Sequence, residues 1–599
     1  MRYLIVLFTA FFAINTSNSQ INKSDLANQL PQELIVSIQE SPEKKQMPLT
    51  FVTSGTEHNM DFSPKLNYIK SANKAPNPNE VYQYKIDNQD LKGRFETDNT
   101  NVFFDAEDDS RENSFAVTEQ FYGDIDGGCP NDNTIAIANN GKIISMMNTG
   151  VGIYDENGNT INLFDLGAFF FNYIGDPCDP KVEYDPVSDK FVAFVQACGN
   201  YKDKIGIAFS QTNDPNGNWY VYILSSDALG DGSWGDYPKL AITNDEVFIS
   251  LNQYTLTDNS YKYSVIYQID KQSGYTGQNL NYKIWKDVGF TSVIARSGTR
   301  QYGPGAYVIS SNSGQGNSIL FGDITGNVDD SNSKFVTYDV PTAAYTVPFS
   351  ANQAGTSDLL DTGDSRGMDA YYQNGIVHFV HTVSDNGYGA VRYYRLDPTN
   401  LDGYNFFTTT DSGNKDYAYP SISPFTKDWQ DQTSIIFFAA SGSNYAPELR
   451  AKVFKSDFST QASQMIFAGS GPCLSCLDPN RNAHRWGDYS SVAVKYNNNQ
   501  PTVWVAGSIA GSGSNIWWTY LAELTSIGNT TSTIDENSTS SVATMPNPAQ
   551  DRFEVEIQTE QSELMDFLLY DQMGKLSARV YTGTVRTGHQ DLVNLTAKY

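Results

Sequence analysis

The sequence predicts an all-β protein built around a seven-bladed β-propeller, with six or eight blades as the alternatives. Its 599 residues include 37 Tyr and 33 Phe, whereas only 18% are charged, and this balance favours short strands and turns over helices. The motif Trp-Gly-Asp-Tyr occurs twice, at Trp234 and at Trp486, each time ahead of two short apolar runs separated by a turn. Related openings recur roughly every 50 to 70 residues, a spacing typical of four-stranded blades joined by long loops.

Each predicted unit consists of an acidic or Gly-rich loop, a short strand, a tight turn and a more apolar strand. The units begin at Pro130, Cys178, Gly235, Gly363, Lys415 and Trp486. Asn, Asp and Gly occupy most of the turns, because they tolerate positive φ. The long gap after the third unit fits two units, since residues 303–326 contain another strand pair with a degenerate opening. A two-sheet sandwich is the rival fold, but it leaves the repeated opening unexplained.

An aspartate stands just before the first strand of most units. In a propeller the inner strand follows the loop from the previous blade, so these residues should converge at one end of the central channel. We expect a ring of carboxylates made by Asp132, Asp179, Asp236, Asp364, Asp416 and Asp488. Two interpretations remain open. Either each aspartate caps a turn by accepting backbone N–H bonds, or several hold a cation, with calcium as the candidate because it prefers many oxygen ligands.

The N-terminus predicts export. Residues 1–19 contain Arg2, an apolar run and small residues at Ser17 and Ser19, which is the pattern of a signal peptide. No later segment reaches about 18 apolar residues, so we expect no transmembrane segment. Residues 20–114 are predicted to be irregular, with a strand at 81–86 (VYQYKI) and no chemistry. The expected location is therefore the outer-membrane surface or the medium, reached through the periplasm.

A net charge of −28 narrows the range of partners. A strongly acidic surface repels phosphate backbones, so nucleic acid is excluded as a partner. The charge is consistent with solubility in a salty medium, and also with binding of divalent cations or cationic material.

The chain has five cysteines, and an exported protein would fold in an oxidising compartment where they can form disulfides. If Val187–Asp189 is a turn, antiparallel counting places Cys178 opposite Cys198, which predicts a disulfide. The other three, Cys129, Cys473 and Cys476, can form one pair and leave one thiol. The alternative for Cys473-x-x-Cys476 is a zinc site with nearby His484, but this supplies fewer than the four ligands that structural zinc requires.

The C-terminal region begins with a Ser/Thr-rich linker at 528–544. At 545–599 the alternating FEVEI, then DFLLYD and the turn sequence DQMGK, predict a small β-sandwich. This tail resembles the type IX secretion C-terminal sorting domain through Pro546-Asn547-Pro548-Ala549, Leu569-Tyr570-Asp571, Gly574-Lys575 and Asn594-Leu595. The resemblance implies the type IX secretion machinery as a partner. Family members usually continue with a Gly-Tyr strand and a basic last strand, so the domain is predicted to be truncated.

Residues 120–525 resemble secreted bacterial sialidase-like propellers of the Asp-box type. The resemblance is carried by Pro130 with Asp132, Tyr154-Asp155, the run from Asp179 to Pro186, and SQTNDPNGNWYVY at 210–222. That last stretch is similar to an Asp-box, with Asp214, Gly217 and Trp219 in a tight hairpin. The resemblance implies that this hairpin is structural and lies away from the catalytic face.

The candidate catalytic residues do not match a sialidase. Such an enzyme needs three arginines, a Tyr with a Glu, and an acid, but the neighbours of Arg300, Arg366 and Arg485 differ from the family motif and Glu is scarce. A polysaccharide lyase is conceivable with the residues His381, His484, Arg366, Arg485 and Tyr489. His378 and His381 lie three apart on one strand and face opposite sides, so they cannot jointly ligate one metal.

The loop at 473–489 (CLSCLDPNRNAHRWGDY) is the region most expected to carry function. Exposed Trp and Tyr side chains there would suit stacking on sugars. The candidate ligand-binding residues are Asp236, Tyr237, Trp486 and Asp488. We therefore expect a glycan- or polymer-binding or adhesion propeller without catalysis. The alternative is a glycan-degrading enzyme, a polysaccharide lyase or a glycoside hydrolase, acting at the same channel face.

Overall fold

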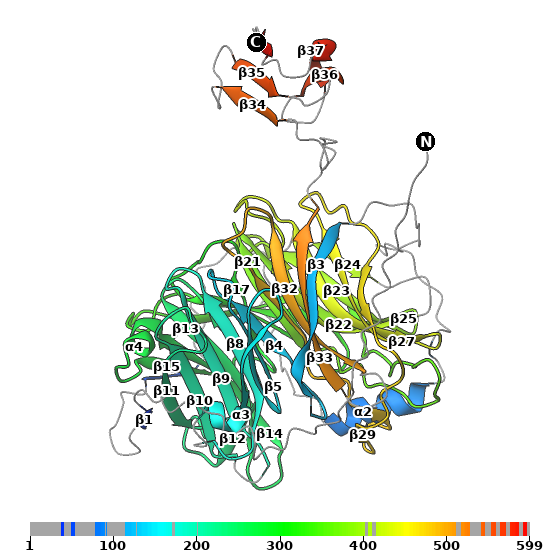
Figure 1. The fold of residues 1–599 in the computed structure, drawn as a ribbon. Coiled ribbons are helices and arrows are strands. Elements are labelled where there is room, and N and C mark those ends of the chain that lie inside the picture. The colour runs from blue at the N-terminus through cyan, green and yellow to red at the C-terminus, as the bar shows by residue number, and fades with distance from the viewer. Residues whose placement is uncertain are drawn as a thin grey trace. The chain divides into compact units, whose positions relative to one another are not determined.

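The computed structural model divides the chain into two units, Met1–Ser526 and Ile527–Tyr599 (Figure 1). It describes residues 78–89, 92, 114–126, 128–170, 174–199, 202–401, 405–409, 415–510 and 517–527, together with the strands at 38–40 and 50–53 and five strands between 541 and 595. The predicted signal peptide lies outside these residues. Among the described residues, no helix is both long and apolar enough to cross a membrane.

The first unit is a seven-bladed β-propeller, as predicted. The strands of each blade are given from the channel outward. Blade 1 contains β4 (Thr134–Ile137), β5 (Ile143–Met147), β6 (Gly150–Tyr154) and β7 (Thr160–Asp165). Blade 2 contains β8 (Pro177–Asp185), β9 (Lys190–Ala197), β10 (Lys204–Ser210) and β11 (Trp219–Ser225), and blade 3 contains β12 (Ser233–Ile242), β13 (Glu246–Thr255), β14 (Tyr261–Asp270) and β15 (Tyr282–Lys286). Blade 4 contains β16 (Val293–Ile294), β18 (Ala306–Ser311), β19 (Gly316–Ile324) and β20 (Phe335–Tyr345). Blade 5 contains β21 (Gly367–Gln373), β22 (Ile376–Asp385), β23 (Tyr388–Leu396) and β24 (Asn405–Thr409). Blade 6 contains β25 (Lys415–Pro424), β26 (Ser434–Gly442), β27 (Tyr445–Phe454) and β28 (Gln464–Ala468).

Blade 7 joins the two ends of the propeller sequence. Its inner strands are β31 (Ser491–Val494), β32 (Thr502–Ala510) and β33 (Trp517–Ser526), and its outer strand is β3 (Phe115–Asp126). β3 lies antiparallel beside β33, with Phe115 opposite Ser526 (Figure 1). Because the first strand completes the last sheet, the ring is closed by a ladder of backbone hydrogen bonds. The radial repetition of blades leaves only short, protected strand edges.

Blade 4 corresponds to the predicted unit with the degenerate opening. The strand pair predicted within 303–326 is β18 and β19, which are the second and third strands of that blade. Its innermost strand, β16, has only two residues. The next two-residue strand, β17 (Arg296–Ser297), pairs in parallel with β21 of blade 5. The chain therefore leaves the channel early in blade 4, and this blade contributes no aspartate of the predicted ring.

The N-terminal region corrects one prediction. The stretch VYQYKI is part of helix α2 (Pro78–Asn88), so the strand predicted there is wrong. Proline is favoured in the first turn of a helix, where no intrahelical partner for its nitrogen is needed. Val81 and Lys85, one turn apart, are buried, whereas Tyr84 and Ile86 are exposed. Two short strands, β1 (Ile38–Glu40) and β2 (Thr50–Thr53), add in parallel to β11 and β15.

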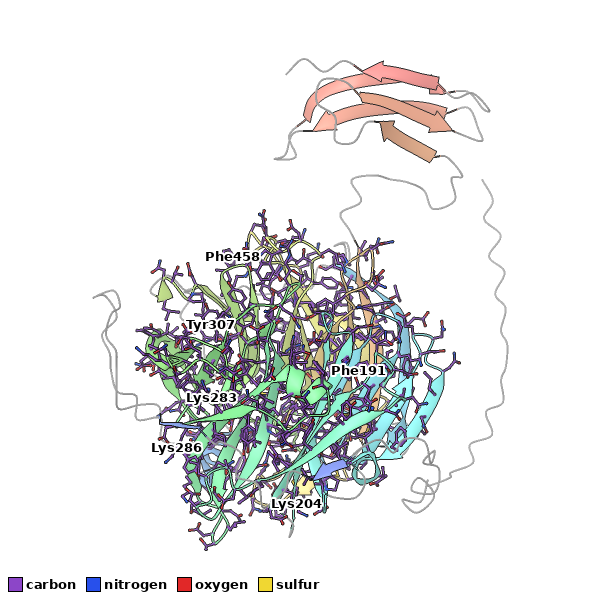
Figure 2. All side chains as sticks on the ribbon, turned by 90° about the vertical axis from the view of Figure 1, so that its left-hand side faces the viewer. Phe191, Lys204, Lys283, Lys286, Tyr307 and Phe458 are labelled. Carbon is purple, nitrogen blue, oxygen red and sulfur yellow. A yellow bond between two sulfur atoms is a disulfide. The ribbon has the colours of Figure 1, made fainter. Side chains whose placement is uncertain are left out.

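Apolar side chains pack between neighbouring blades, and Figure 2 draws the side chains on the ribbon. Phe191 of β9, labelled there, is fully buried in an apolar cluster shared by blades 1 and 2. In the same cluster Trp219 begins β11, after the turn from Asp214 to Gly217, and its indole N–H donates to the carbonyl of Pro215. The predicted hairpin at 210–222 is therefore present, with its tryptophan packed between strands. Its classification as an Asp-box stays a prediction.

The second unit contains two small sheets. One has the order β34-β35-β38 and the other pairs β36 with β37; their strands are β34 (Ser541–Met545), β35 (Phe553–Gln558), β36 (Glu563–Tyr570), β37 (Leu576–Val585) and β38 (Asp591–Leu595). The predicted strands FEVEI and DFLLYD correspond to β35 and β36. Residues 528–540 of the predicted linker lie outside the described residues, and its last four residues belong to β34.

Candidate functional site

A cavity of about 530 Å³ lies at the end of the central channel where the loops enter the inner strands; we call it the mouth cavity. It is lined by side chains from several blades and from α2. The charged and aromatic ones are Asp132, Asp179, Asp236, Asp364, Asp488, Lys202, Arg366, Arg481, Arg485, Tyr82, Trp234, Tyr237, Tyr254 and Tyr419. Five of the six aspartates of the predicted ring are among them. The structure thus brings most of the ring to one shared site.

Asp416 is the exception. Its carboxylate pairs with the ammonium of Lys92 and accepts a hydrogen bond from the backbone N–H of Gly389 at 3.0 Å. The side chain is fully buried and does not line the mouth cavity. Asp416 therefore anchors the N-terminal segment to blade 6, as a structural partner of Lys92. The sequence reasoning missed this role, because it assigned no contacts to residues 20–114.

Three inner strands share one irregularity that shapes the cavity. Asp179, Tyr237 and Tyr419 have φ values of 51°, 58° and 55°, and each precedes a proline. The pairing register of all three strands shifts at these positions, as in a β-bulge. A residue before proline normally avoids a helical conformation, so this backbone is held by its surroundings. At two of the bulges consecutive residues line the cavity, Cys178 with Asp179 and Asp236 with Tyr237.

Tyrosine hydroxyls bond across the channel at the floor of the mouth cavity, which Tyr237 and Tyr419 line. The hydroxyl of Tyr237 donates to the carbonyl of Asp488 at 2.8 Å, and that of Tyr419 donates to the carbonyl of Asp361 at 2.9 Å. Tyr489 donates to the carbonyl of Pro180 at 3.0 Å. Each bond joins two different blades or their loops. The floor is therefore held by cross-channel hydrogen bonds, and the cavity is a cup at the channel end.

Each of the three arginines of the mouth cavity is paired with a carboxylate. Arg366 makes a bidentate contact with Asp364, through bonds of 2.8 and 2.7 Å. Arg485 pairs with Asp488 at 2.5 Å. The predicted third arginine, Arg300, instead lies 5.9 Å from the ring centre of Trp429 and does not line the cavity. The three guanidinium groups present are therefore largely neutralised by protein carboxylates.

Arg481 is the third arginine at the cavity, and the sequence reasoning missed it. Its guanidinium pairs with Asp361 and lies 4.5 Å from the ring centre of Tyr82. Asp361 also pairs with Lys85 of α2 at 2.6 Å. Burial opposes ionisation of Asp361, but these two cations hold the pKa of its carboxyl below the ordinary value. Its position in the sequence could have indicated that Arg481 reaches the cavity, because Arg481 belongs to the loop that was predicted to face the channel.

Three carboxylates of the cavity have no ion-pair partner among the described residues: Asp132, Asp179 and Asp236. Asp132 accepts bonds from the backbone N–H of Asp488 at 2.6 Å and from Asn148 at 2.7 Å. One side-chain amide, that of Gln196, donates to both Asp179 at 3.1 Å and Asp236 at 2.6 Å. These aspartates are therefore held by neutral donors, which leave a charged carboxylate uncompensated.

The acidity of these groups follows from their surroundings. Burial, together with the charge of Asp488, raises the pKa of Asp132 to about 7. Burial and the neighbouring aspartates raise the pKa of Asp179 well above its ordinary value, and burial also raises that of Asp236. For Asp488 burial acts in the same direction, but Arg485 and the other guanidiniums bring its pKa below the ordinary value. One cavity thus contains carboxyls of opposite character.

The predicted calcium site is not formed by this arrangement. Within the part of the chain that the structure describes, no group of three or more His, Cys, Asp or Glu side chains is placed so that it could hold a metal ion. Asp416 and Asp364 are occupied by Lys92 and Arg366 respectively. Five of the aspartates line the cavity, and Asp416 does not.

Most of the candidate catalytic residues lie outside the cavity. His381 is buried within blade 5, where its ring nitrogens face the carbonyl of Ser365 at 3.0 Å and the hydroxyl of Tyr394 at 3.2 Å. Burial lowers its pKa to about 3. His484 accepts a bond from the backbone N–H of Cys476 at 3.2 Å. Neither histidine lines the mouth cavity, so only Arg366 and Arg485 of the predicted lyase set reach it.

The aromatic residues before β31 are part of the core. Trp486 is 1% exposed and stacks on Trp517, with ring centres 6.2 Å apart. Tyr489 is 4% exposed, with its hydroxyl bonded as described above. Neither can offer a face to a sugar, which corrects the expectation of exposed aromatic side chains in this loop. The half-exposed rings at the cavity are instead those of Tyr82 and Tyr254.

The first unit contains two disulfides among its described residues, and one of them lines the cavity. The bond between Cys178 and Cys198 confirms the prediction, and both residues line the cavity rim. Cys129, ahead of blade 1, bonds to Cys476 in the loop ahead of blade 7, with Cα atoms 5.3 Å apart. Cys473 is buried and lies outside both disulfides. Because Cys476 is oxidised, the zinc alternative for this region is wrong.

Comparison with known proteins gives similarity of fold only. No known family model and no curated protein matches the sequence. A chain of the mitotic checkpoint complex is 10% identical over 70% of this chain and 98% of its own, with a TM-score of 0.33. Prolyl oligopeptidase B from Galerina marginata is 9% identical over 72% of this chain and 55% of its own, with a TM-score of 0.34. The sialidase from Trypanosoma rangeli is 10% identical over 67% and 59%, with a TM-score of 0.30.

These similarities do not assign a function. The three proteins differ in what their names describe, and their identity to this chain is too low to align individual residues of a site. The chemistry of the mouth cavity must therefore be argued from its own side chains.

Proposed function

We propose that the propeller is a non-catalytic glycan-binding module of an extracellular protein, and that the mouth cavity receives a sugar unit of the ligand. The observation that carries this proposal is a 530 Å³ cavity at which carboxylates, guanidiniums and half-exposed aromatic rings converge from several blades. Ligand sites typically measure about 300–1,000 Å³ and combine aromatic walls with a few placed polar groups.

The lining suits the chemistry of a carbohydrate. Sugar hydroxyls both donate and accept hydrogen bonds, so they can pair with carboxylates such as Asp236 and with guanidiniums such as Arg485. The rings of Tyr82 and Tyr254 are half-buried at the cavity, which is the exposure needed to stack on the apolar face of a sugar. The floor tyrosines and the disulfides hold these groups on a rigid scaffold.

The proposal includes a location outside the cell. Two disulfides in the first unit agree with folding in an oxidising compartment. Residues 1–19 would direct export to the periplasm, and residues 545–599 would be read by the type IX secretion machinery. Secretion into the medium or attachment to the outer-membrane surface would follow.

The test is a binding measurement with a matched pair of tyrosine variants on one helix. Calorimetry of the full chain against a panel of neutral, acidic and basic oligosaccharides should identify at least one ligand. Tyr82→Ala, which removes a ring from the cavity, should weaken binding about fivefold, since stacking on a ring is worth on the order of 1 kcal/mol. Tyr84→Ala changes an exposed ring on the same helix and should leave affinity unchanged. No binding across the panel, or equal losses for both variants, would contradict the proposal.

A glycan-degrading enzyme is the second candidate, favoured by one observation. Asp132 and Asp488 share the cavity, and their pKa values are displaced in opposite directions, as in a pair made of a general acid and a carboxylate base or nucleophile. Incubation with each oligosaccharide that binds, followed by measurement of new reducing ends and unsaturated products, tests it. Release of product that Asp132→Asn abolishes would replace the binding function with catalysis.

A further inference from the structure

We infer that the mouth cavity selects an amine-bearing glycan, in which an ammonium group pairs with the carboxylates of Asp132, Asp179 and Asp236. This inference rests on the proposed function, because it names the class of glycan bound at the same site. Oligomers of glucosamine are the simplest members of that class.

The charged side chains of the cavity favour a positively charged ligand. Arg366, Arg481 and Arg485 are each paired with a carboxylate, so they offer little attraction to an anion. Lys202 lies 3.7 Å over the ring of Trp234 and donates to a side-chain amide at 3.1 Å, so it pairs with no aspartate. The cavity lining contains five carboxyl groups and four cationic side chains. A ligand ammonium would pair with the carboxyls that have no cation beside them and would favour their ionised form.

Two nearby lysines make no ion pair with the three aspartates among the described residues. Lys181 places its ammonium 2.7 Å from the ring centre of Tyr489, and burial with repulsion from Lys239 lowers its pKa well below the ordinary value. Lys239 donates to the carbonyl of Met368 at 2.7 Å. Both lysines therefore have aromatic or carbonyl partners, and their charges act on Asp179 without a direct contact. The three aspartates line the cavity that a ligand can enter.

Unused donors at the same cavity indicate neutral acceptors in the ligand. Trp234 lines the cavity and is 7% exposed, and its indole N–H has no partner within the described residues. The Nε–H of Arg485 is also buried without a partner there. A buried donor without a partner has lost its hydrogen bond to water, and a ligand oxygen would replace that bond. An amino sugar combines the two features, because it carries one ammonium group among several hydroxyl oxygens.

The charge of the whole protein acts in the same direction. A net charge of −28 concentrates cations around the molecule and repels acidic polysaccharides. Long-range attraction would raise the rate of encounter, and the three aspartates would then select the ammonium at short range.

The first experiment measures calorimetric affinities of the full chain at pH 6 for four hexamers: glucosamine, N-acetylglucosamine, glucose and galacturonic acid. The glucosamine hexamer should bind at least tenfold more tightly than the N-acetylated one, which has the same backbone without the charge. Equal or tighter binding of the acetylated or acidic hexamer would overturn the inference and leave the proposed function standing. If none of the four hexamers binds, both the inference and the proposed function are wrong. Hexalysine binding as tightly as the glucosamine hexamer would overturn the assignment to a glycan.

The second experiment separates charge from structure. Asp179→Asn and Asp236→Asn keep the size of the side chain and should each weaken glucosamine hexamer binding at least tenfold more than they weaken glucose hexamer binding. Asp457→Asn removes the same charge from an exposed turn outside the cavity and should have no effect. Thermal unfolding establishes that each variant is folded. Unchanged glucosamine affinity in both cavity variants, or an equal loss for both hexamers, would overturn the inference.

Discussion

The hydroxyl of Tyr237 lies 2.8 Å from the backbone carbonyl of Asp488 and donates a hydrogen bond to it across the channel. This bond joins the two Trp-Gly-Asp-Tyr motifs, which belong to blades 3 and 7. Their tyrosine rings, those of Tyr237 and Tyr489, also meet edge to face, with centres 6.4 Å apart. The repeated motif therefore marks the starts of two blades, which contact each other across the channel and form part of the floor of one cavity.

Replacement of Tyr237 by Phe tests the cross-channel bond. Tyr237→Phe leaves the Asp488 carbonyl without its donor in a site where the tyrosine is only 8% exposed. The expected loss is about 1–2 kcal/mol of unfolding free energy, as for a buried hydrogen bond whose acceptor stays unsatisfied. Urea denaturation measures it. Tyr84→Phe on the exposed face of α2 is the control, and a similar loss in that variant would remove the support for a specific role of the bond.

The ion pair of Lys85 with Asp361 should hold α2 on the propeller. Lys85 also donates to the carbonyl of Gly363 at 2.8 Å, so it contacts the cavity wall directly. Lys85→Met should weaken docking of the helix by on the order of 2 kcal/mol, less than for a fully broken pair because Arg481 still compensates Asp361. Hydrogen exchange of residues 78–88 should become faster.

Gln83→Met is the control for that experiment, since it places the same side chain on the exposed face of α2. Exchange in the control should match the native protein. If Lys85→Met exchanges no faster than the control, the helix is held by Val81 and its other contacts instead.

The raised pKa of Asp132 predicts a stability that depends on pH. Its pKa is about 7 in the folded protein against an ordinary value of 3.8, so the folded state retains a proton that the unfolded chain releases between these values. Folding stability from this group therefore falls as pH rises from about 4 to 7. Asp132→Asn, which cannot ionise, should gain stability relative to the native protein at pH 8 compared with pH 4, by on the order of 2–4 kcal/mol.

Chemical denaturation at the two pH values measures this difference. Asp457→Asn provides the contrast, because hydrogen bonds from Ser459 lower the pKa of that exposed carboxyl. It should show no gain at pH 8. A gain of equal size in both variants would point to the net charge of the protein as the cause, and no gain for Asp132→Asn would contradict the assigned pKa.

The cysteine pairing predicts a simple labelling pattern. In the native protein iodoacetamide should label no cysteine, since Cys473 is fully buried and the other four are oxidised. Unfolding in urea without reductant should give one adduct, at Cys473, and reduction should give five. Peptide mapping by mass spectrometry identifies the sites. A peptide in which Cys473 is bonded to Cys476 would contradict the pairing seen here.

Much of the architecture followed from local sequence signals. Two apolar runs split by an Asn, Asp or Gly turn form a hairpin within about 20 residues, so the pairs β4–β5, β8–β9 and β12–β13 could be predicted from sequence alone. The same logic gave the number of blades and the disulfide between Cys178 and Cys198. It failed at residues 81–86, where Tyr and Val suggested a strand but packing of one helical face against the propeller decided the outcome.

The sequence by itself therefore determined the repeating modules, their order and the set of aspartates ahead of the inner strands. Tertiary structure alone decided which aspartates share the cavity and which are neutralised, because Lys92 reaches Asp416 across 324 positions and Arg481 reaches Asp361 across 120. It also buried Trp486 and Tyr489, and it brought Tyr82 to the cavity from outside the blades. The physical reason is that charge compensation and exposure depend on neighbours distant in the chain, whereas strand and turn formation depends on adjacent residues.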